Sequence, residues 1–449
     1  MMAGAVLLPL LTLAIGCAAL NNHSLYFATQ GWTHGTDVYK GGLYGGEVEI
    51  KENGNSGNLS ETKVDCFMSA PNHIKEDNLK TRGISFDEMD NEVLFHLYDE
   101  RRLLVYTFPR CQAHPYRELC DPEKVLDTDK SQGRTIFSYA ITTHNYEECP
   151  NKILAFALYN YYPYFVVKRA IKRPGEDREV IITVTVEIRK VAGCEFDLFH
   201  SQKPFNMDGC SVHLATLYNT TVDKCDSVST GNSLLILRND EKFQKHYFTQ
   251  VFLKTDTSFS INLYEASKRG TIRLLHTTYL PYSYSELTED ARHIGALSYK
   301  DGKICWSAVN QILCGDWSYE RYLENVEVVL QPGQAAEAGI CQNGPNSHPD
   351  YANITTGVAI AESNEENGLS LFFGCQQEEE GRGGAGLLRL LPGTGASVLF
   401  PLTDNYKKVY AGGMFIAENC DMIPIAGSMI NRHSAGLISL VLISLKIVW

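Results

Sequence analysis

The chain has 449 residues, of which 44% are hydrophobic and 21% are charged, enough apolar side chains for a large buried core. Its formal net charge is -13 at pH 7, the opposite of the basic balance that nucleic-acid-binding proteins show. These values exclude a disordered, highly charged chain and predict a folded protein with no nucleic-acid partner.

The N-terminus carries an almost unbroken apolar run over residues 5–20, which ends in the small residues Cys17, Ala18 and Ala19. A run of about 16 residues is short for a membrane span of roughly 20, and small residues suit cleavage by signal peptidase. No Lys or Arg precedes the run, a departure from the usual basic start. We predict a secretory signal peptide over residues 1–20. A buried N-terminal strand and a bacterial lipoprotein signal at Cys17 are the alternatives.

Thirteen cysteines are present, and twelve remain once Cys17 is assigned to the signal peptide. Twelve is an even number, as a fully oxidised chain requires, and no CxxC pair points to zinc. Within two pairs, Cys111 with Cys120 and Cys305 with Cys314, the spacing of nine suits a disulfide across a hairpin or loop. The alternative is a cytosolic protein with free thiols. The predicted disulfide cysteines are Cys66, Cys111, Cys120, Cys149, Cys194, Cys210, Cys225, Cys305, Cys314, Cys341, Cys375 and Cys420.

Sequons for N-glycosylation also fit a secreted protein. We predict glycosylation at Asn58, Asn219 and Asn353, each of which begins an Asn-x-Ser/Thr triplet. Asn58 lies in residues 53–60, the most loop-like stretch of the chain.

Strand patterns dominate the chain. Residues 92–108 have the pattern of a strand, an acidic turn and a second strand, and the same pattern recurs at 233–251, 260–275, 302–317, 370–391 and 413–425. Residues 179–189 alternate apolar and polar side chains with a period of two. Only 117–126 and 284–297 could hold a few helical turns. We therefore predict an all-β fold.

Catalytic and metal signatures are absent or incomplete. The chain has no GxSxG, HExxH, GxxxxGK[ST] or GxGxxG motif, so we assign no catalytic residue. Asp127, Asp129 and Ser131 alternate as calcium ligands do, but Gln132 stands where such a loop needs glycine. We interpret this stretch as an acidic loop, assign no cofactor, and keep calcium as the one to test.

Two segments are dense in tyrosine. Residues 159–165 place five aromatic rings in seven positions, and residues 279–284 place three in six. Exposed tyrosines stack on sugars or anchor protein partners, whereas alternation along a strand can also bury them in a core. The predicted contact surface is Tyr159, Tyr161, Tyr162, Tyr164, Tyr282 and Tyr284. The basic residues that follow, within 168–173, are predicted to form a solvated turn.

A resemblance to known repeat proteins extends over about six short segments. Asp301-Gly-Lys-Ile-Cys-Trp-Ser307 resembles the strand that opens a blade in NHL and YWTD-type β-propellers, and Gly412-Gly-Met-Phe-Ile-Ala-Glu418 resembles another. The likeness covers about a quarter of the chain, and the YWTD tetrad itself is absent. It implies a propeller of six or seven blades with disulfide-clipped loops over residues 21–425, and it transfers no functional residue. Tandem β-sandwiches are the competing architecture.

The C-terminus ends in an apolar stretch, residues 435–449, interrupted by Lys446. The small residues Ala426, Gly427 and Ser428 and a polar spacer at 431–434 precede it. Small residues, a polar spacer and an apolar tail are the layout of a GPI-anchor signal. We predict such a segment at 426–449. A final strand that completes a sheet, or another membrane attachment, is the alternative.

These features predict a non-catalytic binding protein that is secreted or tethered to the outer face of the plasma membrane. Its partner would be an extracellular protein or a glycan. The alternative is a secreted calcium-dependent hydrolase, similar to the lactonases and esterases that hold their ion with residues from different blades.

Overall fold

The structure of the protein is a computed structural model. It describes residues 22–29, 32–34, 37–39, 42–49, 65–69, 83–89, 92–98, 102–109, 135–140, 152–160, 162–174, 180–192, 207–222, 228–254, 259–280, 296–340, 354–364, 368–376, 383–390, 397–401 and 409–417. The predicted signal peptide (1–20) and C-terminal segment (426–449) lie outside these residues.

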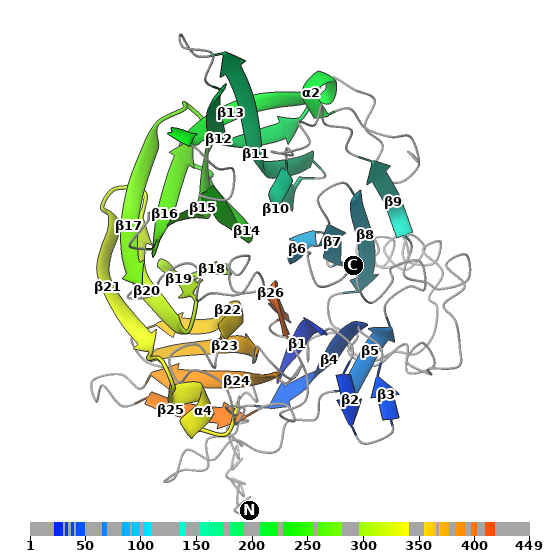
Figure 1. The fold of residues 1–449 in the computed structure, drawn as a ribbon. Helices are drawn as coiled ribbons and strands as arrows, with labels where there is room; N and C mark the ends of the chain where they lie inside the picture. Colours follow the sequence, from blue (N-terminus) through cyan, green and yellow to red (C-terminus); the bar gives the residue numbers. More distant parts are fainter. Residues whose placement is uncertain are drawn as a thin grey trace, which may run out of the picture.

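Six four-stranded antiparallel sheets, here numbered 1 to 6 along the chain, make up most of the described structure (Figure 1). Sheet 1 holds β26 (Val409–Ala417), β1 (Asn22–Thr29), β4 (Gly42–Glu49) and β5 (Asp65–Ser69), and sheet 2 holds β6 (Gly83–Met89), β7 (Glu92–Tyr98), β8 (Arg102–Pro109) and β9 (Thr135–Ala140). Sheet 3 holds β10 (Lys152–Tyr159), β11 (Tyr162–Pro174), β12 (Val180–Val191) and β13 (Ser211–Val222), and sheet 4 holds β14 (Val228–Asn239), β15 (Gln244–Lys254), β16 (Phe259–Ser267) and β17 (Ile272–Leu280). Sheet 5 holds β18 (Leu297–Lys300), β19 (Lys303–Ala308), β20 (Gln311–Ser318) and β21 (Tyr322–Leu330), and sheet 6 holds β22 (Ile354–Asn364), β23 (Gly368–Gln376), β24 (Gly383–Leu390) and β25 (Ser397–Pro401).

The remaining described elements are short. They are a hairpin of β2 (Trp32–His34) and β3 (Asp37–Tyr39) and two four-residue helices, α2 (Met207–Cys210) and α4 (Gln334–Glu337). No helix in the described part of the chain has the length and apolar character needed to cross a bilayer. The predicted helical stretch 117–126, and nearly all of 284–297, lies outside the described residues. The all-β prediction is confirmed.

Alternation along the strands sorts side chains between the two faces of each sheet. On β12, Val184, Val186 and Ile188 are fully buried, whereas Glu187 between them is only half-buried. β23 is different, because Leu371, Phe372 and Phe373 are all fully buried. A strand that is apolar on successive residues must be covered on both faces, so sheet 6 is enclosed where β23 passes.

Five of the six predicted strand–turn–strand units are hairpins, and the sixth, 413–425, lies outside the described residues beyond the end of β26 at Ala417. Residues 233–251 form β14 and β15, 260–275 form β16 and the start of β17, and 302–317 contain β19 and β20. Lys300 pairs with Lys303 around the two-residue turn Asp301-Gly302, in which both residues have positive φ angles of 48° and 81°. A tight hairpin turn of this type needs left-handed backbone at both positions, which Asp-Gly readily adopts.

Two local predictions were wrong. Residues 168–173 belong to the long strand β11 and are not a solvated turn, and Lys168 is buried. The segment 303–307, expected to open a blade, lies in β19, which is the second strand of its sheet.

The hydrophobic core is divided into layers between neighbouring sheets. One layer joins sheets 3 and 4, and includes Tyr164, Val186, Tyr247 and Val251. A second joins sheets 4 and 5 around Phe248, Phe252, Trp306 and Trp317, and a third joins sheets 5 and 6. Sheet 4 therefore packs on both of its faces.

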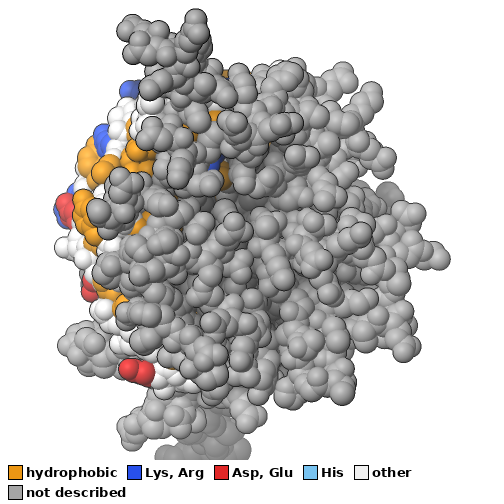
Figure 2. Space-filling model, viewed as in Figure 1, with side chains coloured by type: hydrophobic (Ala, Val, Ile, Leu, Met, Phe, Trp, Pro, Cys, Tyr) orange, Lys and Arg blue, Asp and Glu red, His pale blue; other side chains and the backbone are white. Residues whose placement is uncertain are grey.

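At the outer edge of sheet 4, Arg273 of β17 lies 3.7 Å from the ring centroid of Tyr322 on β21. Figure 2 shows hydrophobic side chains along this flank, where Ile272 and Leu274 are exposed.

The first strands of the six sheets contact one another in a circular order. β26 contacts β6, β6 contacts β10, β10 contacts β14, β14 contacts β18, β18 contacts β22, and β22 contacts β26. These strands lie nearest the middle of the molecule, and the later strands of sheets 3 to 6 lie toward the outside (Figure 1). On the inner strands β22 and β26, Gly357 allows close approach of Met414, because an added Cβ would meet Met414 Cγ at 2.6 Å.

A strand pairing and a disulfide connect separate strands of the chain. β1 pairs antiparallel with β26 from Ser24↔Ala417 onward, so the described ends of the chain share sheet 1. Cys305 and Cys314 face each other on β19 and β20 and form a disulfide with a Cα–Cα distance of 4.1 Å. This confirms the prediction made for that pair. Cys210 and Cys375 each take part in a further disulfide.

Candidate functional site

The first hairpin of sheet 3 brings tyrosines together from both of its strands. β10 ends at Tyr159 and β11 begins at Tyr162, and the two residues pair directly across the turn. Asn160 occupies the turn with a φ of 48°, a left-handed backbone that asparagine tolerates better than most residues. Because side chains alternate along a strand, Tyr164 lies on the same face as Tyr162.

Two lysines reach these rings from different sheets. Lys190 of β12 pairs with Tyr164, and its Nζ lies 4.1 Å from the centroid of the Tyr162 ring. Lys245, at the start of β15 in sheet 4, places its Nζ 4.3 Å from the centroid of the Tyr159 ring. The same Nζ donates a hydrogen bond of 2.8 Å to the hydroxyl of Tyr164. Ammonium groups at these distances are held by the negative faces of the rings.

Tyr247 completes the group. It follows Lys245 by two residues on β15, so it faces sheet 3 as well, and its ring centroid lies 5.7 Å from that of Tyr164. We call Tyr159, Tyr162, Tyr164, Lys190, Lys245 and Tyr247 the Tyr–Lys cluster. Tyr164 and Tyr247 are 1% and 2% exposed, whereas Tyr162 is 49% exposed. The cluster therefore runs from the core between sheets 3 and 4 out to the surface.

Burial and like charges set the protonation of the cluster. Burial, followed by the positive charges of Lys190, Lys268 and Arg238, lowers the pKa of Lys245 to about 8. Burial also raises the pKa of Tyr247 to about 12 and raises that of Tyr164. At neutral pH Tyr164 and Tyr247 are thus uncharged, and Lys245 is mostly protonated but gives up its proton more readily than an exposed lysine.

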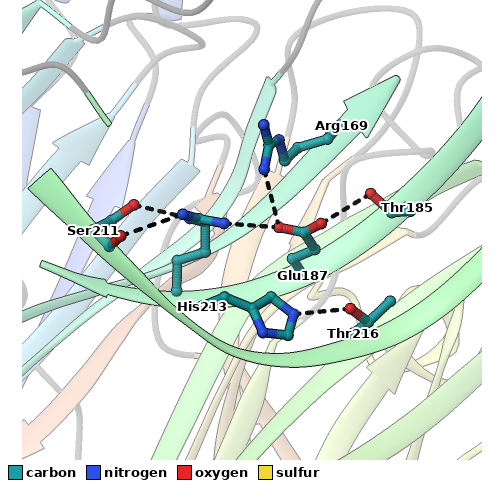
Figure 3. Close-up of polar contacts among 7 residues, drawn as sticks. Arg169, Thr185, Glu187, Ser211, His213 and Thr216 are labelled. Atoms are coloured by element: carbon teal, nitrogen blue, oxygen red, sulfur yellow. Dashed lines mark hydrogen bonds and ion pairs between the residues drawn. The ribbon is translucent and has the colours of Figure 1, made fainter. Parts of the chain in front are cut away.

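A second polar group lies on the opposite face of sheet 3 (Figure 3). Glu187 Oε2 accepts from Arg189 Nη1 at 3.0 Å and lies 3.6 Å from Arg169 Nη1, and Thr185 donates to Oε1 at 3.2 Å. Arg189 also donates from Nε to the hydroxyl of Ser211 at 2.8 Å. The carboxylate and both guanidinium groups are bonded within the sheet, so this network stabilises sheet 3 and presents no charge for a ligand.

A third polar group is buried between sheets 4 and 5. His246 Nδ1 lies 2.6 Å from Glu265 Oε1, and the two residues are 8% and 3% exposed. The rings of Trp317 and Tyr319 pack against the imidazole, with centroids 5.6 and 5.0 Å away. An enclosed pair of this kind has no access to a substrate, and we assign it a structural role.

Only three of the six residues predicted to form a contact surface lie within the described part of the chain. Tyr162 is exposed, Tyr159 is half-buried, and the ring of Tyr164 is buried and takes no part in the accessible surface. Tyr161, Tyr282 and Tyr284 lie outside the described residues. Phe165, in the same aromatic segment, is buried and packs against Phe156 on the other face of the strand.

The remaining predicted sites are located as follows. Asn219 is exposed on β13, the edge strand of sheet 3, while Asn58 and Asn353 lie outside the described residues. Cys66 lies in β5. Seven other cysteines lie outside the described residues: Cys111, Cys120, Cys149, Cys194, Cys225, Cys341 and Cys420.

Metal ligands do not gather in the described ranges, where no group of three or more His, Cys, Asp or Glu side chains is placed to hold an ion. The calcium-like segment at 127–133 lies outside them. Asp316 is engaged within sheet 5: burial would raise the pKa of its carboxyl, but hydrogen bonds from Asn325 and Lys303 and the charge of Lys303 lower it.

Sequence reasoning missed Lys190, Lys245 and Tyr247. Lys190 is the polar end of an otherwise apolar face of β12, and Lys245 alternates with Tyr247 at the start of β15. Both are ordinary features of a strand end. Only the packing of sheet 3 on sheet 4 brings the two ammonium groups to the same tyrosines.

No protein-family model matches the chain, and no curated protein sequence matches it either. Among solved structures, the chain is similar to an endo-arabinase from Bacteroides thetaiotaomicron, at 10% identity over 56% of this chain and 93% of that one, with a TM-score of 0.25. It is also similar to an exo-β-1,3-galactanase from Phanerochaete chrysosporium, at 8% identity over 87% and 70%, with a TM-score of 0.28. Oligopeptidase B from Leishmania major gives 8% identity over 85% and 49%, with a TM-score of 0.26. Scores this low carry no argument about fold or activity.

Proposed function

We propose that this protein is a non-catalytic binding protein, secreted or held at the cell surface, built as a six-bladed β-propeller. Its binding site is the exposed end of the Tyr–Lys cluster, and its partner is an extracellular protein or a glycan.

The circular order of strand contacts supports the propeller. Each of the six sheets is an antiparallel meander, and its first strand contacts the first strands of two neighbouring sheets. A ring of such sheets, with the two described chain ends paired in sheet 1, is the arrangement of propeller blades around an axis. Tandem β-sandwiches would instead pack sheets in face-to-face pairs.

The Tyr–Lys cluster is the observation that carries the binding proposal. Tyr162 is about half exposed although residues 163–168 of its strand are buried. The ammonium group of Lys190 lies over the Tyr162 ring, and that of Lys245 lies over the ring of Tyr159, its partner across the turn. Partly exposed aromatic rings backed by a rigid core are typical anchors in interfaces. The strands that carry the Tyr–Lys cluster belong to sheets 3 and 4, which pack against each other through a shared core, so the exposed end of the cluster is preorganised.

The test is capture of ligands by the purified full chain on a glycan array and from a library of extracellular proteins. Tyr162→Ala should abolish capture of the true partner. Tyr279→Ala, which removes a ring that is 77% exposed near the end of β17, should leave capture intact. A partner that survives Tyr162→Ala but is lost with Tyr279→Ala would move the site to the second tyrosine-rich segment and contradict the proposal.

The calcium-dependent hydrolase is tested separately by a thermal melt in EDTA and in millimolar calcium. An ion bound only by the native state at 100 times its dissociation constant adds about 2.7 kcal/mol, which raises the midpoint by roughly two degrees in a large domain. Our proposal expects equal midpoints. A clear rise would contradict it and lead to esterase and lactone assays.

A further inference from the structure

We infer that Lys190 and Lys245 form an anion site that binds the sulfate or carboxylate group of an acidic saccharide, with Tyr162 as the ring against which the sugar packs. This inference deepens the proposed function and rests on it.

The geometry places two positive charges around one buried ring. The Nζ of Lys190 lies 5.9 Å from the Tyr164 centroid and that of Lys245 lies 5.2 Å from it. Lys190 reaches this position from β12 in sheet 3, and Lys245 reaches it from β15 in sheet 4. Both ammonium groups thus lie within 6 Å of the same ring centroid, and the charge of Lys190 acts on Lys245.

Among the described residues, the charges of Lys190 and Lys245 have no acidic counterpart. Some other cations of sheets 3 to 5 do have carboxylate partners: Arg189 with Glu187, Arg238 with Asp240, and Lys303 with Asp316. Within the described ranges, no carboxylate forms an ion pair with Lys190 or Lys245. The positive charges of Lys268 and Arg238 also act on Lys245. In a chain of net charge -13, two lysines without a carboxylate partner among the described residues, at a partly exposed aromatic site, are a feature that the fold alone does not require.

Repulsion between these cations disfavours the empty site. Burial and the nearby positive charges lower the pKa of Lys245 to about 8, so the cluster holds its proton less firmly than an isolated lysine would. An anion bound between the two ammonium groups would reverse that effect and favour protonation. Binding should therefore take up protons between pH 7 and pH 9 and weaken as the pH rises through that range.

The tyrosines favour a saccharide over an acidic peptide. Tyr162 is 49% exposed and lies next to half-buried Tyr159, so an accessible aromatic surface adjoins the two cations. A sugar ring that carries an acidic substituent matches both features at once, since its apolar face packs on tyrosine and its anion meets the ammonium groups. An extended acidic peptide would use the charges and leave the ring unmatched.

The test measures binding of defined oligosaccharides to the purified full chain by calorimetry at about 0.15 M salt. The probes are a sulfated heparin-derived hexasaccharide, its fully desulfated form, a hyaluronan hexasaccharide that carries carboxylates only, and a hexaglutamate peptide. Lys190→Met and Lys245→Met should each weaken the preferred acidic saccharide at least tenfold. Lys303→Met, the matched loss of a lysine that Asp316 already neutralises, should change affinity less than twofold. The sulfated and carboxylated arms decide which anion is preferred.

The outcomes separate this inference from the proposed function. If the captured partner is lost with Tyr162→Ala but both lysine variants bind it normally, the binding site stands and the anion inference is overturned. If hexaglutamate binds with the same lysine dependence and no saccharide does, the ligand class is wrong. If neither Tyr162→Ala nor the lysine variants change any binding, both proposals fail. Melting curves of each variant establish that it is folded.

Discussion

The two faces of sheet 4 bury similar apolar residues but differ in the polar residue that β15 places beside them. Toward sheet 3, β15 presents Tyr247 and then Lys245, a lysine that no carboxylate of the described residues pairs with. Toward sheet 5, the same strand presents Phe248 and His246, and the row finishes in a histidine that is paired with Glu265 and enclosed. Lys245 and His246 are neighbours in the chain, yet strand alternation gives one an open setting and the other a closed one.

We interpret this difference as one between the proposed binding face of sheet 4 and a structural face. The closed face pairs its histidine with its glutamate, so these residues contribute to stability. On the open face no carboxylate of the described residues pairs with Lys190 or Lys245, so these two lysines should contribute little to stability and much to recognition. Substitutions on the two faces should therefore have opposite signatures.

The largest effect is expected for His246→Ala on the closed face. Removal of the imidazole leaves the Glu265 carboxylate buried without its partner, which should lower the free energy of unfolding by about 3–5 kcal/mol. Urea denaturation followed by tryptophan fluorescence measures it. His213→Ala, at an exposed histidine, is the control and should change stability by less than about 0.5 kcal/mol. A loss below 1 kcal/mol at His246 would argue against the enclosed pair.

The disulfide of sheet 5 should have the next largest effect. Replacement of both Cys305 and Cys314 by alanine should lower stability by about 2–4 kcal/mol, because the unfolded chain gains freedom. Urea denaturation measures the loss, and ligand capture should not change, because the cross-link lies beyond the closed face. Loss of capture in a folded double variant would show that the two faces of sheet 4 are coupled.

Tyr164→Phe tests the link between core and surface on the open face. It removes the hydroxyl that accepts from Lys245 at 2.8 Å and should lower stability by about 1 kcal/mol. A double-mutant cycle with Lys245→Met measures the coupling between the two groups. Independent effects that simply add would mean that the hydrogen bond contributes nothing.

The smallest effect is a change in the pH dependence of stability at Lys245. Its folded pKa of about 8 lies below the value of 10.5 for a free lysine, so between these pH values the unfolded state binds more protons. Stability from this group should therefore rise with pH from about 8 toward 10. Lys245→Met should remove that rise, whereas Lys242→Met, at an exposed turn residue, should keep it. The raised pKa of Tyr247 sets the upper limit of the test, because its contribution is lost above pH 10.

Local patterns predicted the strands well and the site poorly. The alternation of Val184, Val186 and Ile188 identifies β12 and its buried face without any knowledge of neighbours, and the spacing of Cys305 and Cys314 identifies their hairpin. Tyr162 was predicted because its segment is rich in tyrosine. Lys190 and Lys245 could not be predicted, since a lysine near the end of a strand is common and nothing in the sequence between them indicates that they meet.

The sequence by itself determined the all-β character, the hairpins and the pairing of the two hairpin cysteines. Each of these depends on side-chain alternation, turn residues or contacts between near neighbours in the chain. The tertiary structure decided which sheets pack together, the pairing of β1 with β26, and the meeting of Lys190 and Lys245 at Tyr164. Those contacts join residues that are far apart in sequence, and they form only when the apolar faces of separate sheets find one another.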